Sequence, residues 1–86
     1  MPFKLDLPFW EAQGWKVKIF DKEGPEEPHV NVIRKKTWWR FGLRGETFLD
    51  ATPEPKRVPS ELVEEILLHL NTLKAEWNKL HPRNPC

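Results

Sequence analysis

The sequence predicts an α+β fold in which an antiparallel meander sheet of three to four strands is covered by one long C-terminal helix, giving two layers. Two observations lead to this prediction. Apolar and polar residues alternate along several segments between residues 15 and 49, which is typical of strands with one buried face. Between residues 60 and 81 the apolar residues recur every three or four positions, the spacing that lines up one face of a helix.

All 86 residues are expected to form a single domain, near the lower size at which a chain folds alone. Five Trp and five Phe compensate for the short length, because aromatic side chains bury large apolar areas. The sole cysteine, Cys86, excludes an internal disulfide and a cysteine metal cluster. No apolar run reaches the ~20 residues of a membrane helix, and the N-terminus does not resemble a secretory signal. We therefore expect a cytoplasmic protein without a membrane partner.

Residues 1–14 are expected to form an N-terminal arm or short strand, because Phe3, Leu5 and Leu7 alternate with polar residues until Pro8.

Antiparallel strands are predicted within residues 15–49. In the first, Trp15, Val17 and Ile19 share one face. An acidic loop over residues 21–28, with a turn at Gly24-Pro25, separates this strand from the next. The predicted strands run from Trp15 to Ile19, from His29 to Arg34 and from Trp38 to Leu43, with a short fourth from Thr47 to Leu49.

A proline-rich loop without regular structure is predicted over residues 50–59, and one helix over residues 60–81. Ser60 is the predicted N-cap, and Pro82 ends the helix before a tail of residues 82–86. The apolar stripe of this helix comprises Leu62, Ile66, Leu70, Leu73, Trp77 and Leu80, widened by Val63 and Leu67.

A basic segment follows the acidic loop and carries two tryptophans. Strand alternation turns Trp39 inward and Trp38 outward beside Arg40. Cations neutralise phosphates and an exposed Trp stacks on an unpaired base, while Trp with Arg is also enriched at protein interfaces. We therefore predict a surface that binds a partner protein or nucleic acid (RNA or DNA). Its residues are Arg34, Lys35, Lys36, Trp38, Arg40 and Arg44.

Two alternatives are open for this segment. Lys35-Lys36 is also typical of a solvated turn, and an N-terminal arm that packs Phe9 or Trp10 against Trp38 would cover it.

Short motifs along the chain resemble the small prokaryotic domain-of-unknown-function family 4160. They are Pro28-His29-Val30 with Val32, Phe41-Gly42-Leu43, Ser60-Glu61-Leu62 leading to Ile66, and Trp77-Asn78. The resemblance spans roughly residues 15–80. It implies a compact α+β protein, often encoded beside another small protein in a toxin–antitoxin-like pair. The family commonly has a second histidine where this chain has Asn31.

His29 is the candidate catalytic residue. It follows Glu26, Glu27 and Pro28, so a carboxylate beside it would make it a general acid or base for RNA cleavage. In that role, Arg40 and Lys35 or Lys36 would stabilise the phosphate charge. Glu27 and Asn31 are further candidates to assist His29. The alternative is a structural histidine that hydrogen-bonds the preceding loop. A metal site at His29 and Asn31 matches no strong ligand spacing, so neither a metal nor a cofactor is predicted.

These residues therefore favour two functions. The first is a non-catalytic binding protein, one component of a toxin–antitoxin-like module. The second is a small metal-independent ribonuclease that uses His29. The sequence leaves self-association open.

Overall fold

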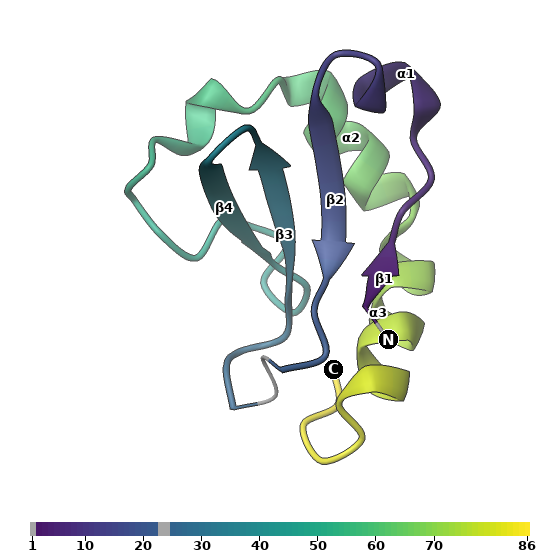
Figure 1. The fold of residues 1–86 in the computed structure, drawn as a ribbon. Coiled ribbons are helices and arrows are strands. Elements are labelled where there is room, and N and C mark those ends of the chain that lie inside the picture. The colour runs from purple at the N-terminus through teal and green to yellow at the C-terminus, as the bar shows by residue number, and fades with distance from the viewer. Residues whose placement is uncertain (1, 23–24) are drawn as a thin grey trace.

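The computed structural model describes residues 2–22 and 25–86, and it confirms the α+β class. Figure 1 shows the helices α2 and α3 following one another along one side of the sheet. In chain order the elements are β1 (Phe3–Lys4), α1 (Pro8–Glu11), β2 (Trp15–Ile19), β3 (His29–Arg34), β4 (Thr37–Gly42), the 3₁₀ helix η1 (Pro55–Arg57), α2 (Ser60–Leu68) and α3 (Leu70–Leu80). Of the acidic loop predicted over residues 21–28, Glu23 and Gly24 lie outside the described residues.

The four strands form one antiparallel sheet in the order β1-β2-β3-β4, which is the predicted meander. In β2, Trp15, Val17 and Ile19 are buried, while Lys16 and Lys18 lie on the other face. Because successive side chains of a strand point to opposite faces, this alternation also determines which face of the sheet the helices cover.

The strand that completes the sheet beside β2 is β1, from the N-terminal arm, and it forms one edge of the sheet. Residues 47–49, predicted as a short strand, contribute a single bridge between Phe41 and Phe48. The N-terminal arm also contains the short helix α1, which begins at Pro8. Proline suits the first position of a helix because its φ is already helical and its missing N–H is not needed there.

The C-terminal segment forms two helices, so the single helix predicted over residues 60–81 is wrong. The chain leaves the helical conformation at His69, which has φ −104° and ψ 16°. The His69 imidazole Nδ1–H donates to the carbonyl oxygen of Glu65 at 2.8 Å, and its main-chain N–H is shared between Glu65 and Ile66 at 3.2 and 3.1 Å. A side chain that bonds to the carbonyl four residues back competes with the helix ladder and bends it. The main-chain hydrogen bonds of the next helix begin where the N–H of Leu73 donates to the carbonyl oxygen of His69 at 2.9 Å.

The predicted apolar stripe still supplies the core, because Leu62, Ile66, Leu73 and Trp77 are all fully buried. Leu67 is 38% exposed, so it does not widen the stripe as expected. The buried core cluster comprises Leu5, Leu7, Trp15, Val17, Ile19, Val30, Val32, Trp39, Phe41, Leu43, Val58, Leu62, Ile66, Leu73 and Trp77. Across residues 2–22 and 25–86, no helix has the length and apolar character to cross a bilayer.

The start of α2 also differs from the prediction. Pro59 occupies the N-cap position and Ser60 is the first helical residue, so Ser60 is not an N-cap. Its hydroxyl instead lies 3.3 Å from a carboxylate oxygen of Glu61. The loop over residues 50–59 contains the 3₁₀ helix η1, although it was expected to lack regular structure.

Candidate binding surface

The face of the sheet opposite the helices, here called the outer face, carries two rows of side chains that run across β2, β3 and β4. The strand register aligns the members of each row as cross-strand neighbours. The rows are Lys16–Ile33–Trp38 and Lys18–Asn31–Arg40. The β4 ends of these rows, Trp38 and Arg40, have different surroundings.

Trp38 is an exposed aromatic residue with a fixed neighbour. Its side chain is 48% exposed, and its ring stacks on Phe20 with 5.3 Å between the centroids and 18° between the planes. The ring that stacks on Trp38 does not come from the arm, because Phe9 and Trp10 pack against each other with 5.2 Å between centroids and line a pocket with Glu65 and His69. Trp38 therefore presents apolar surface to solvent from a defined position, as strand alternation predicted.

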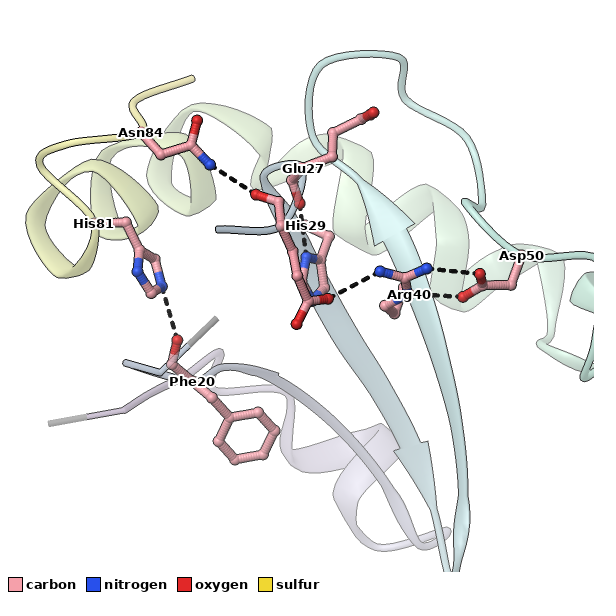
Figure 2. A network of polar contacts seen from close by, with 8 residues as sticks. Phe20, Glu27, His29, Arg40, Asp50, His81 and Asn84 are labelled. Carbon is pink, nitrogen blue, oxygen red and sulfur yellow. Dashed lines mark hydrogen bonds and ion pairs between the residues drawn. The ribbon is translucent and has the colours of Figure 1, made fainter. Parts of the chain in front are cut away.

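Arg40, in contrast, is engaged within the fold. Its Nε and Nη2 donate to the two carboxylate oxygens of Asp50 at 2.8 and 2.7 Å (Figure 2). Its Nη1 donates to a carboxylate oxygen of Glu26 at 2.9 Å. This bidentate geometry is the strong form of a charge-assisted hydrogen bond. The bonds to Asp50 raise the pKa of Arg40, and the bonds from Arg40 lower the pKa of Asp50. The Arg40 charge that the sequence placed on the binding surface is thus neutralised by two acids.

We expect Asp50→Asn to lower the free energy of unfolding by about 1 kcal/mol near neutral pH, a modest loss because both side chains of the pair are 36% exposed and water screens them. Folding lowers the pKa of Asp50, so the contribution is present above its unfolded value of about 3.9 and is lost as the pH falls through the folded pKa. Urea unfolding at several pH values measures this. A difference from the wild type that persists in strong acid would contradict the ion-pair origin, and Asp6→Asn, at an exposed aspartate, is the matched control.

His29 lies beside this ion cluster and is fully buried. Its Nδ1–H donates to the carbonyl oxygen of Glu27 at 2.8 Å, and its Nε2 lies 3.9 Å from a carboxylate oxygen of Glu26. Since a carbonyl oxygen only accepts, this bond places a hydrogen on Nδ1. A general acid or base must come within hydrogen-bond distance of its substrate, so the burial of His29 favours the structural alternative. Within the described residues, no group of three or more His, Cys, Asp or Glu side chains is arranged to hold a metal ion.

The C-terminal tail is bound next to the same cluster. The Asn84 side-chain amide donates to the carbonyl oxygen of Glu26 at 2.7 Å, and the Trp77 indole N–H donates to the carbonyl oxygen of Asn84 at 2.7 Å. At the end of α3, the His81 Nε2–H donates to the carbonyl oxygen of Phe20 at 2.8 Å (Figure 2). These bonds hold the end of the chain against the loops that precede β3.

The other predicted binding residues occupy three places. Lys35 and Lys36 form the exposed turn between β3 and β4, where Lys35 has φ 55°. Arg34 lies on the helix-covered face, with its guanidinium carbon 5.5 Å from the centroid of the Trp15 ring. Arg44 lies beyond the opposite end of β4 and donates to a carbonyl oxygen of the tail at 2.7 Å. The six predicted residues therefore do not form one continuous surface.

Three residues of the outer face are not among the predicted binding residues, and they are Lys16, Lys18 and Phe20. The two lysines were on the polar side of the β2 alternation, and that signal was sufficient to place them beside Trp38 once β2 and β4 were both paired with β3. No sequence signal indicated the contact between Phe20 and Trp38, because it joins the residue after β2 to a residue of β4, and these two strands are not neighbours in the sheet.

No protein-family model matches the chain, and comparisons with curated proteins and with solved structures found no match either. The resemblance to family 4160 therefore stays a prediction.

Proposed function

We propose that this chain is a non-catalytic binding protein whose contact surface is the outer face of the sheet around Trp38, and that its partner is a protein with an acidic rim around an apolar centre. The single observation that carries the proposal is the exposed Trp38 ring held in place on Phe20. Tryptophans in such positions are enriched among interface hot spots, because a rigid aromatic ring buries a large area with little loss of entropy.

The charges around Trp38 favour an acidic partner. Lys16 lies in the same cross-strand row as Trp38, Lys18 lies in the next row, and Lys36 is at the adjacent turn. None of the ion pairs among the described residues uses these three lysines. Cations at the rim of an interface act mainly on the association rate and on the choice of partner.

The resemblance to family 4160 supports a specific source for the partner. In a toxin–antitoxin-like arrangement, the partner is the small protein encoded beside this one. Whether this chain would be the toxin or the antidote does not affect the contact surface proposed.

We expect Trp38→Ala to weaken binding of the purified product of the adjacent gene by about 30-fold, the effect of removing an interface hot spot. Isothermal titration calorimetry measures the affinity. Phe9→Ala is the matched control, because it removes an aromatic ring that is 67% exposed from α1, away from the outer face.

Three results separate the alternatives for this surface. Equal affinities of the wild type and Trp38→Ala would remove the proposed surface. A loss of equal size in Phe9→Ala would point to general surface hydrophobicity instead. Binding of single-stranded RNA that depends on Trp38, with no binding of the adjacent protein, would replace the protein partner with a nucleic acid.

A further inference from the structure

We propose that a cavity at the β3–β4 turn binds a phosphoryl group. The cavity has a volume of about 220 Å³ and lies where the ends of β2, β3 and β4 meet the 3₁₀ helix η1. It is separate from the outer-face surface around Trp38, so the inference does not rest on the proposed function. Its lining residues are Trp15, Arg34, Lys35, Thr37, Trp39 and Arg57.

The cavity gathers positive charge from distant parts of the sequence. Arg34 and Lys35 come from the end of β3 and the turn, whereas Arg57 comes from the last residue of η1. Among the described residues, no acidic side chain lines the cavity, and no ion pair involves any of these three cations. The carboxylate of Glu54, close by in the sequence, is paired with Lys56 at 3.4 Å. The cations of the cavity are therefore available to an external anion.

Two buried tryptophans position the guanidinium groups. The guanidinium carbon of Arg34 lies 5.5 Å from the Trp15 ring centroid, and that of Arg57 lies 5.6 Å from the Trp39 ring centroid. The two indole rings are themselves 5.5 Å apart. A guanidinium that packs on an aromatic face still directs its N–H donors along its own plane, where they can bind an oxyanion.

The position of Arg57 is set by main-chain contacts. The carbonyl oxygen of Glu54 accepts the indole N–H of Trp39 at 2.9 Å and the main-chain N–H of Arg57 at 3.1 Å. This one carbonyl ties η1 to the buried tryptophan, so Arg57 is held above Trp39. Preorganised donors lose less entropy when they bind a ligand than mobile surface side chains do.

The size and chemistry of the cavity suit a phosphoryl group. Arginine binds phosphate through paired N–H donors, and lysine and the Thr37 hydroxyl add further donors. The cavity is smaller than the ~300 Å³ at which sites for drug-sized ligands begin, which suits a small tetrahedral anion with its waters. The rest of a phosphorylated ligand would therefore lie outside the cavity.

The test is a titration of the ¹⁵N-labelled full chain with inorganic phosphate at constant ionic strength. We expect the indole N–H resonances of Trp15 and Trp39 to shift while that of Trp38 stays in place. Arg57→Gln and Arg34→Gln should each weaken binding about tenfold, because each removes charge-assisted hydrogen bonds. Circular dichroism of each variant establishes that it is folded.

A control variant removes a cation without touching the cavity. Arg83→Gln makes the same chemical change at an exposed residue of the C-terminal tail. This variant should bind phosphate as the wild type does. An equal loss of affinity in this control would show that only net charge matters and would overturn the proposal.

A 5′-mononucleotide and a single-stranded oligonucleotide distinguish the sources of the phosphoryl group. Tight binding of the mononucleotide that depends on Arg57 would identify a small phosphorylated ligand. Tighter binding of the oligonucleotide with the same dependence would identify a backbone phosphate of nucleic acid. Both results support the site, whereas binding that is the same in Arg57→Gln and Arg34→Gln as in the wild type, or no binding of any of the three probes, would remove it.

Discussion

Trp77→Ala is expected to lower the free energy of unfolding by about 3–5 kcal/mol, the cost of removing a large buried aromatic side chain. Trp77 has the largest fully buried side chain of the described residues, and its ring lies 4.0 Å from His81 and 5.5 Å from His29, measured between centroids. Domains have free energies of unfolding of about 5–15 kcal/mol, so this loss is a large fraction of the total stability. Urea unfolding followed by circular dichroism measures the change.

A second substitution at the same position separates packing from hydrogen bonding. Trp77→Phe keeps an aromatic ring but removes the indole N–H that holds Asn84. We expect a smaller loss of stability together with faster amide exchange in the tail. A Trp77→Ala variant as stable as the wild type would contradict the central place of this residue in the core, and Phe9→Ala, at an exposed ring, is the control.

His29→Ala is expected to lower the free energy of unfolding by about 2–4 kcal/mol, because it opens a cavity and leaves the carbonyl oxygen of Glu27 without its donor. The chain contains a close control for this substitution. His69 also donates from Nδ1 to a main-chain carbonyl oxygen at 2.8 Å and has a carboxylate oxygen at 3.9 Å, but its side chain is 40% exposed. His69→Ala should therefore cost less than about 1 kcal/mol. Equal losses of unfolding free energy in His29→Ala and His69→Ala would mean that the burial of His29 does not contribute to stability.

The same position tests the ribonuclease alternative. His29→Gln keeps a polar side chain of similar size, so it is the variant to compare with the wild type in an assay with purified RNA. We expect no difference between the two, because the His29 side chain is fully buried. A folded His29→Gln protein that had lost an RNA cleavage activity of the wild type would instead assign His29 a catalytic role.

The sheet was predictable because strand alternation is a local signal. The alternation over Trp15–Ile19 predicted both the strand and its buried face, and the exposed position of Trp38 follows from the same rule applied to β4. The break at His69 was not predictable from periodicity, because the apolar spacing continues on both sides of it. The hydrogen bond from the His69 imidazole to the main chain, which competes with the helix ladder, has no signal in that spacing.

The candidate sites depended more on contacts between distant residues. Arg40 was read as a surface cation, yet the acids that neutralise it are 10 and 14 residues away in the sequence. Arg57 was read as part of a proline-rich loop, and only the fold places it with Arg34 and Lys35 around one cavity. The charge pattern along the chain gives the number of cations in a segment, but it does not indicate which of these cations form ion pairs with acidic side chains in the folded protein.

The amino-acid sequence by itself determined the α+β class, the meander of strands and the buried side of β2 and β4, because these follow from residue spacing within one element. The tertiary structure alone decided where the C-terminal helix breaks, which cations are left outside ion pairs among the described residues, and that the Phe20 ring stacks on Trp38. The physical reason is that ion pairs and ring contacts form between side chains that folding brings together, and their energies depend on distances that no local pattern contains.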